Sequence, residues 1–272
     1  MVTDSASNVP PELARELGIT VVPLHLRFGD ESFRDGLDMD PAVFYGRLRR
    51  GDVATTAAPS VGDWLAGYER AGSDEVVCVT LASGLSATHQ EARLAGERFS
   101  GAVEVVDSTS ASMGEGFAAI AAARAARERT SLHDVTARAR EVASRVTLVG
   151  AIETFEYLRR SGRVGKLQAY AATRLAIRPV FRLIAGEIEA IGRPRTRSRA
   201  IAMVVEEALK AAGGGGALHV AALHADAEDD AVSMIERIRA ETDVAESFVV
   251  ESTPAIGANA GPGLVGLAAY RE

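Results

Sequence analysis

Hydroxyl-bearing side chains are concentrated in three short segments of small residues, at 55–60, 82–88 and 107–110. Each segment follows an apolar run that is typical of a strand or precedes the start of a predicted helix. In open α/β sheets, ligands gather at the carboxyl ends of strands, where helix N-termini offer unpaired N–H groups to an anion. A Thr and Ser pair can hold a buried carboxylate at the mouth of an apolar cavity, because hydroxyls donate hydrogen bonds without adding charge. Each segment taken alone is more often only a helix cap.

Nucleophilic or metal chemistry is an alternative use for these hydroxyls. A serine hydrolase needs a base beside its serine, and the sequence offers His25, His89, His133, His219 and His224. Ser86, however, lacks the flanking glycines that place a nucleophile on a strand-turn-helix elbow. The histidines also lack the paired spacing that metal sites show. We therefore predict no catalytic residue and no metal site.

Arginines are clustered in two segments, 159–163 and 193–199. A guanidinium fork matches a carboxylate or phosphate better than a lysine ammonium does. We interpret Arg193, Arg195 and Arg197 as a surface on which a partner protein docks. An ordinary solvated face explains the same residues equally well, and this alternative stays open.

The composition is that of a globular protein, since 47% of the 272 residues are hydrophobic and 25% are charged. The formal charge of -7 disfavours nucleic-acid binding, although transient membrane contact stays open. The single cysteine, Cys78, lies in an apolar run, which predicts a buried thiol without a disulfide. The sequence shows neither a signal peptide nor a membrane-spanning run, so we expect a soluble, cytoplasmic protein.

The pattern of elements predicts an α/β fold with two domains. In the first half the predicted strands are 20–26, 75–81 and 102–107, and the predicted helices are 11–17, 41–50, 60–71, 86–99, 113–128 and 132–145. In the second half the predicted strands are 148–154, 180–184, 187–191, 218–225, 245–251 and 264–271, with a hairpin turn at 185–186. We expect an amino-terminal domain at 1–150 with a mainly parallel sheet, and a carboxyl-terminal domain at 151–272 with a mixed sheet.

Several segments together resemble the DegV family along nearly the whole chain and in the family's order. They are VTDS at 2–5, FRDGLD at 33–38, TTAAPS at 55–60, LASGLSATHQ at 81–90, LRRSGR at 158–163, GE at 186–187 and GANAGPG at 257–263. Any one of these motifs is weak, whereas their shared order is specific. The resemblance implies two α/β domains that enclose a long-chain fatty acid in an apolar tunnel, with its carboxylate near the domain junction.

The resemblance also implies a role as the lipid-binding subunit of a bacterial fatty acid kinase. In such a kinase an ATP-dependent partner subunit converts the bound fatty acid to an acyl phosphate for phospholipid metabolism. The chain would then be a carrier and not an enzyme, with a fatty acid as its ligand and no cofactor. The competing classes are a hydrolase or a phosphotransferase of the dihydroxyacetone-kinase type, and a regulatory interaction protein.

The family's carboxylate contacts map onto Thr55 or Thr56 in the first segment and onto Ser86 or Ser83 in the second. The family motif Thr-Thr-Ser-Gln-Pro-Ser reads TTAAPS here, so the hydroxyls survive while the polar residues between them are lost. Asn259 stands where the family often has His. An asparagine donates a hydrogen bond but does not titrate near neutral pH, which puts any proton-transfer role of that His in doubt.

Overall fold

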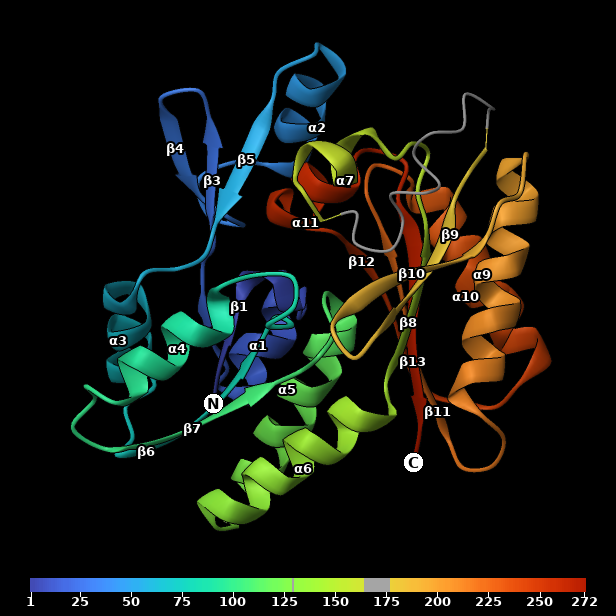
Figure 1. Cartoon of the computed structure of the whole chain (residues 1–272). Coiled ribbons are helices and arrows are strands. Elements are labelled where there is room, and N and C mark those ends of the chain that lie inside the picture. Colours follow the sequence, from blue (N-terminus) through green and yellow to red (C-terminus); the bar gives the residue numbers. More distant parts are fainter. Residues whose placement is uncertain (129, 164–176) are drawn as a thin grey trace.

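The computed structural model describes residues 1–128, 130–163 and 177–272, which form an α/β fold with three sheets (Figure 1). The first sheet belongs to the first half of the chain and is parallel, and the largest sheet belongs to the second half and is mixed, as the sequence predicts. A small third sheet is not predicted by the sequence. None of the described helices is long and apolar enough to cross a bilayer.

The parallel sheet has the strand order β2-β1-β6-β7. Its strands are β1 (Val2–Asp4), β2 (Thr20–Val22), β6 (Glu75–Thr80) and β7 (Ala102–Asp107), and helix α1 (Pro11–Leu17) connects the first two. Val76 and Cys78 of β6 face a core that includes residues of α3 (Val61–Arg70) and α4 (Thr88–Gly96). Val77 and Val79 face the opposite core, with α5 (Met113–Arg127) and α6 (Leu132–Arg145). Burial on both faces explains the continuous apolar run of β6, and Cys78 is buried as predicted.

The single strand predicted at 20–26 is two strands in the structure, because the chain leaves the first sheet after β2. Pro23 follows β2 and has no N–H group to donate to a strand ladder. The next strand, β3 (His25–Phe28), instead pairs antiparallel with β4 (Glu31–Arg34) and β5 (Ala54–Ala57). Helix α2 (Pro41–Arg49) packs Phe44 against Phe28 of this sheet. The segment 55–60 therefore begins inside a strand rather than in a loop.

The mixed sheet has the strand order β10-β9-β8-β13-β11-β12. Its strands are β8 (Thr147–Ala151), β9 (Val180–Ile184), β10 (Glu187–Gly192), β11 (Leu218–His224), β12 (Val244–Glu251) and β13 (Val265–Arg271). The predicted hairpin turn is confirmed, since Ala185 and Gly186 join β9 to β10 with φ values of 48° and 79°. The domain division that we propose near residue 150 lies within β8.

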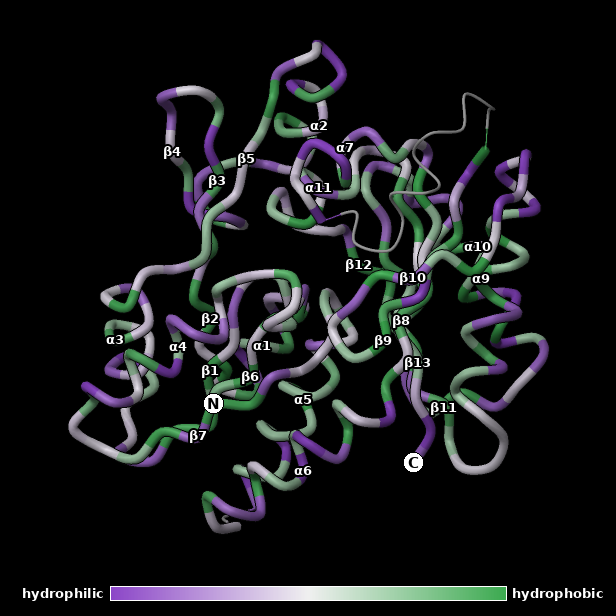
Figure 2. The backbone as a smooth tube through the Cα atoms, viewed as in Figure 1, coloured by the Kyte–Doolittle hydropathy of each residue, from purple (hydrophilic) through white to green (hydrophobic). Residues whose placement is uncertain are grey.

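Helices cover both faces of the mixed sheet. Helices α9 (Arg197–Ala212) and α10 (Glu228–Glu241) close a core on one face. The strands in the middle of the sheet are mostly hydrophobic (Figure 2), and the opposite face shares a core with α5, α7 (Glu156–Arg160) and α11 (Pro254–Ala260). There Phe117 of α5 packs edge-on against Tyr270 of β13 at a centroid distance of 5.2 Å. The two large sheets are therefore joined by one hydrophobic core.

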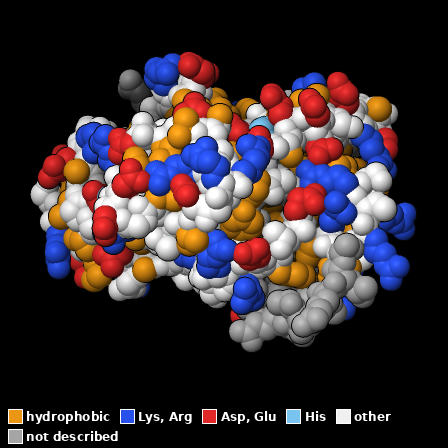
Figure 3. Space-filling view, turned by 90° about the horizontal axis from the view of Figure 1, so that it is seen from above, with side chains coloured by type: hydrophobic (Ala, Val, Ile, Leu, Met, Phe, Trp, Pro, Cys, Tyr) orange, Lys and Arg blue, Asp and Glu red, His pale blue; other side chains and the backbone are white. Residues whose placement is uncertain are grey.

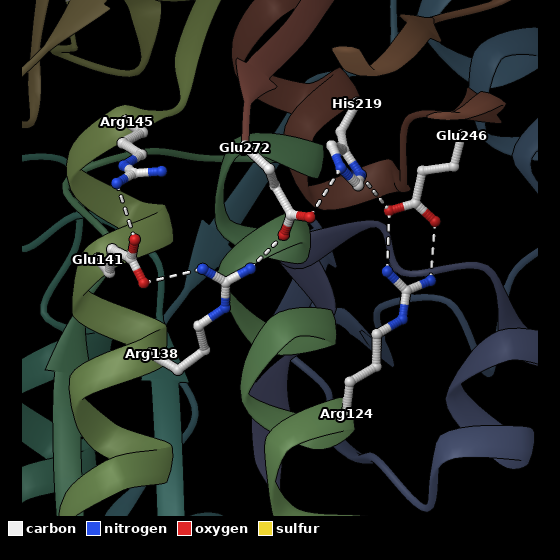
Figure 4. A network of polar contacts seen from close by, with 7 residues as sticks. All are labelled: Arg124, Arg138, Glu141, Arg145, His219, Glu246 and Glu272. Atoms are coloured by element: carbon white, nitrogen blue, oxygen red, sulfur yellow. Dashed lines mark hydrogen bonds and ion pairs between the residues drawn. The ribbon is translucent and has the colours of Figure 1, made fainter. Parts of the chain in front are cut away.

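A polar network lies where α5 and α6 meet the ends of β11, β12 and β13 (Figure 4). Arg124 of α5 donates two hydrogen bonds to Glu246 of β12, at 2.9 and 2.7 Å. His219 lies between Glu246 and Glu272, with its Nδ1 atom 2.8 Å from Oε1 of Glu246. Arg138 of α6 also binds Glu272. These contacts connect helices of the first half to strands of the second half.

Candidate functional site

An apolar cavity of about 100 Å³ lies at the junction of the two large sheets. Its apolar lining comes from both halves of the chain: Leu81, Leu85, Ala111, Leu148, Gly150, Leu158, Phe181, Leu183, Ile188, Leu223, Ile256, Ala260 and Leu264. Three further lining residues are polar: Ser112, Arg163 and Asn259. Such a surface favours a hydrocarbon chain, because a polar ligand group buried here without a partner would lose its hydrogen bonds to water.

Two glycines allow close packing in and near the walls of the cavity. A Cβ atom on Gly150 would lie 2.7 Å from the ring of Phe181, so glycine lets this ring pack directly against β8. A Cβ atom on Gly84 would lie 2.7 Å from the carbonyl oxygen of Gly186. The β9–β10 hairpin can therefore pack directly on the loop that follows β6, and a side chain at residue 84 would separate the two.

A groove of about 560 Å³ adjoins the cavity. It is lined by Gly84, Leu85, Ser161, Gly162, Arg163, Gly186, Glu187 and Ile188. Leu85, Arg163 and Ile188 line both the groove and the cavity. Arg163 therefore stands at the boundary between the apolar interior and a wider, more polar space.

Arg163 is the centre of a polar cluster at this boundary. Its guanidinium donates hydrogen bonds to Oδ1 of Asn259 at 2.8 Å and to the carbonyl oxygen of Leu85 at 3.0 Å. A third bond, at 3.3 Å, goes to the carbonyl oxygen of Ser161. Burial lowers the pKa of Arg163, but an arginine keeps its charge at neutral pH. All three acceptors are neutral, so among the described residues no carboxylate hydrogen bonds to this cation.

Asn259 of α11 connects this cation to the small antiparallel sheet. Its Nδ2 atom donates to the carbonyl oxygen of Ala255 at 2.7 Å and lies 3.5 Å from Oγ1 of Thr56. Thr56 pairs with the fully buried Leu26 across the sheet, and the two side chains share a face. Thr55 pairs with Arg27, and both of these residues are exposed. The strand alternation therefore brings Thr56 and not Thr55 to the cluster.

The two serine candidates also lie in different surroundings. Ser86 is half-buried and directly follows Leu85, whose carbonyl accepts a hydrogen bond from Arg163. Its Oγ lies 2.8 Å from Oγ1 of Thr88 and accepts from the Thr88 N–H at 3.3 Å, so α4 begins at Thr88 rather than at the predicted residue 86. Ser83 is exposed, and its N–H points to the carboxylate of Asp107 at 3.3 Å. Ser86 thus lies beside the cluster, and Ser83 lies outside it.

The three arginines interpreted as a docking surface precede and begin α9. Arg193 and Arg195 are exposed. Arg197 is half-buried and binds Asp230 at 2.7 Å and Glu153 at 2.7 Å. Its guanidinium also donates to the carbonyl oxygen of Gly263. Arg197 therefore connects α9 to α10 and to the loop before β13, while its two predecessors face solvent.

The described contacts of the histidines do not involve the two serine candidates. The described contacts pair His25 with Asp63 at 2.9 Å, His89 with Thr80 at 3.0 Å and His219 with Glu246. None of these histidines is hydrogen bonded to Ser83 or Ser86 within the described part of the chain. The described part of the chain contains no group of three or more His, Cys, Asp or Glu side chains that could hold a metal ion.

Two of the three polar lining residues were not among the residues predicted from the sequence. Arg163 belongs to the LRRSGR segment, which we describe from the sequence as basic and as one of the DegV-like motifs, but without a contact to the ligand. Its position directly after Gly162, which has a φ of 75°, was the available signal. Ser112 lies in the hydroxyl-rich region after β7, just beyond the segment 107–110. Neither residue type specifies a cavity wall, because both are more common on surfaces.

Known proteins resemble this chain over its full length. A family model described as an uncharacterised protein of the DegV family matches residues 1–272. A DegV domain-containing protein of Streptomyces coelicolor is 33% identical over 271 residues, which cover 98% of this chain and 96% of that protein. Protein DegV of Bacillus subtilis is 28% identical over 272 residues, which cover 98% of this chain and 97% of that protein.

Solved structures agree with these matches. A fatty-acid-binding DegV family protein from Thermus thermophilus has a TM-score of 0.94 at 32% identity, covering 100% of this chain and 98% of that chain. DegV of Bacillus subtilis, described as a fatty acid binding protein, has a TM-score of 0.90 at 27% identity with the same coverage. The sequence motifs, the fold and these similarities lead to one conclusion: the chain belongs to the DegV family.

Proposed function

We propose that this protein binds a long-chain fatty acid and presents its carboxylate to an ATP-dependent kinase subunit, which forms the acyl phosphate. The observation that carries the proposal is an apolar cavity that ends at the half-buried cation Arg163. A hydrocarbon chain matches the walls, and a carboxylate matches the polar end. The fatty acid binding described for the similar proteins of Thermus thermophilus and Bacillus subtilis supports the same ligand.

The acyl chain supplies most of the binding free energy in this proposal. Burial contributes roughly 0.8 kcal/mol per methylene, so about fifteen methylenes offer on the order of 12 kcal/mol before ordering costs are subtracted. The length of the chain that fits depends on how the side chains lining the cavity of about 100 Å³ adjust.

In this proposal the carboxylate of the fatty acid binds Arg163, and its neutral neighbours are Thr56, Asn259 and Ser86. A guanidinium can donate two parallel hydrogen bonds to a carboxylate, and a hydroxyl or amide can donate a further one. Thr55 and Ser83 are less suitable, because both side chains are exposed to solvent. Arg163 also lines the groove, so the carboxylate would stand where a partner can reach it.

Docking of the kinase is assigned to the exposed arginines before α9. In the view from above, Lys and Arg side chains alternate with acidic side chains around apolar surface in the middle of the molecule (Figure 3). Arg193 and Arg195 are exposed and can meet acidic groups of a partner. Arg197 is half-buried and binds Asp230 and Glu153. In this proposal Arg197 holds the segment in place, and the catalysis belongs to the partner.

The test compares a fatty acid with the alcohol of the same length. Palmitate should bind the purified protein more tightly than hexadecanol, because only the acid engages the charge of Arg163. Arg163→Met should remove most of this difference, whereas Arg160→Met, an exposed arginine of the same segment, should preserve it. Mass spectrometry of the protein extracted with organic solvent should also show a stoichiometric fatty acid. Equal binding of acid and alcohol by the unmodified protein would contradict the proposal.

A further inference from the structure

Ser112 is a polar lining residue of the cavity that the carboxylate site does not use. It is 2% exposed and lies directly before α5, in a different segment of the chain from Arg163 and Asn259. Its hydroxyl has no hydrogen-bond partner among the described residues. Buried hydroxyls nearly always have a partner, so this one requires an explanation.

The position of Ser112 makes the missing partner unusual. A serine before a helix normally has an extended backbone, and its side chain accepts a hydrogen bond from an N–H group of the first turn. Ser112 instead has φ 51° and ψ -144°, and no side-chain cap bond forms. The hydroxyl oxygen is therefore buried without a partner among the described residues, in a residue that lines the cavity.

We propose that Ser112 is a subsite for a neutral polar group carried along the acyl chain, a hydroxyl or a keto oxygen. The proposal rests on the fatty-acid binding proposed above. It extends that binding to oxygenated fatty acids, whose added oxygen would pair with the Ser112 hydroxyl. A serine hydroxyl can both donate and accept, so it suits either oxygen.

The surroundings of Ser112 favour a neutral group over a second carboxylate. Its neighbours in the cavity wall, such as Ala111 and Leu148, are apolar, and one hydroxyl cannot compensate a buried anion. The cationic end of the cavity, by contrast, is at Arg163.

Such a subsite selects the position of the oxygen along the chain. With the carboxylate fixed at Arg163, only an oxygen at the matching carbon reaches Ser112. An oxygen elsewhere is buried among apolar side chains and weakens binding. Position dependence therefore separates a built subsite from general tolerance of polar chains.

The experiment measures the affinities of stearate and of hydroxystearates with the hydroxyl at successive carbons in the middle of the chain. The variants are Ser112→Ala and Ser112→Gly, and glycine adopts a positive φ without strain, so a folding defect cannot imitate the result. Ser108→Ala is the matched control, because the Ser108 hydroxyl lies in the same loop and is already bonded to Ser110.

We expect one hydroxystearate whose affinity relative to stearate falls about fivefold in both Ser112 variants and stays unchanged in Ser108→Ala. If stearate binds but no isomer shows this dependence, the subsite is wrong while the proposed function stands. If the unmodified protein binds neither stearate nor any isomer, the proposed function fails and the subsite fails with it.

Discussion

Thr55 and Thr56 are adjacent in sequence and lie in opposite surroundings. Thr56 is half-buried beside Asn259, whereas Thr55 is exposed opposite Arg27. We predict that Thr56→Val weakens fatty-acid binding by roughly 1 to 3 kcal/mol, because the carboxylate loses a donor that the apolar side chain cannot replace. Thr55→Val should leave the affinity unchanged. A titration of both variants with palmitate checks this, and equal losses would show that the strand face does not decide the contact.

Buried carboxyl groups of the first half produce a second prediction at the residue scale. Asp4 accepts hydrogen bonds from the N–H groups of Leu81 and Ala6 at 2.9 Å each, yet burial still raises its pKa to about 6. Burial, and next the charge of Asp4, raise the pKa of Glu115 well above its ordinary value. The Thr3 hydroxyl donates to Glu115 at 3.0 Å. The structure therefore favours the protonated form of Glu115.

An acid whose pKa is raised on folding opposes folding once the pH exceeds its ordinary pKa. The free energy of unfolding should therefore fall as the pH rises from about 4 through 6, and continue to fall until Glu115 titrates in the folded state. Glu115→Gln keeps the neutral form at every pH, so it should raise the free energy of unfolding at pH 8 by at least about 1 kcal/mol. Urea unfolding at pH 5 and pH 8 measures this, with the exposed Glu104→Gln as control. A larger gain at pH 5 than at pH 8 would refute it.

At the scale of elements, an ion pair in the network between α5, α6 and the mixed sheet can be compared with an exposed ion pair outside that network. Arg124 binds Glu246 in a two-bond arrangement, and Glu246 is mostly buried. Although burial favours its neutral form, hydrogen bonds from Arg124 and His219 hold the pKa of Glu246 below its ordinary value. Arg140 and Glu104 form a single contact of 3.2 Å, and both side chains are exposed.

We predict that Arg124→Ala lowers the free energy of unfolding by roughly 1 to 3 kcal/mol, because Glu246 is left buried with fewer partners. Arg140→Ala should change it by less than about 0.5 kcal/mol, as exposed pairs contribute little. Denaturant titrations at neutral pH compare the two variants. Equal losses would mean that the contact between the helices and the sheet does not depend on this network.

The elements show how much the sequence predicts. Because β6 is buried on both faces, its sequence is a continuous apolar run, which correctly predicts a strand. The turn residues Ala185 and Gly186 likewise predict the β9–β10 hairpin correctly. The small sheet is not predicted, because the apolar residues on both sides of Pro23 resemble one continuous strand. In the structure the chain changes sheets at this proline. The hydroxyl segments were recognised as candidates, but the choice of Thr56 required the pairing of β5 with β3. Arg163 required the approach of α11, which no local pattern specifies.

At the scale of the whole molecule, the proposed fatty-acid site and the proposed docking segment lie in different parts of the structure. The cavity lies at the junction of the sheets, while Arg193 and Arg195 lie on the exposed segment before α9. No described hydrogen bond or ion pair connects Arg195 to Arg163. A change on the docking segment should therefore leave lipid binding intact, which makes the two functions separable by mutation.

We predict that Arg195→Ala weakens the complex with the kinase subunit and leaves the bound fatty acid in place. Exposed charges at an interface mainly set the association rate and its salt dependence, so the loss should appear in the association rate and shrink at high salt. Arg197→Ala should behave differently and lower folding stability, because Asp230 and Glu153 lose the guanidinium that binds both. Arg98→Ala, an exposed arginine of the first half, is the control. Surface-binding kinetics with the kinase and lipid analysis of each variant give the readouts. If Arg195→Ala loses its fatty acid while its affinity for the kinase is unchanged, the segment belongs to the lipid site and not to a docking surface.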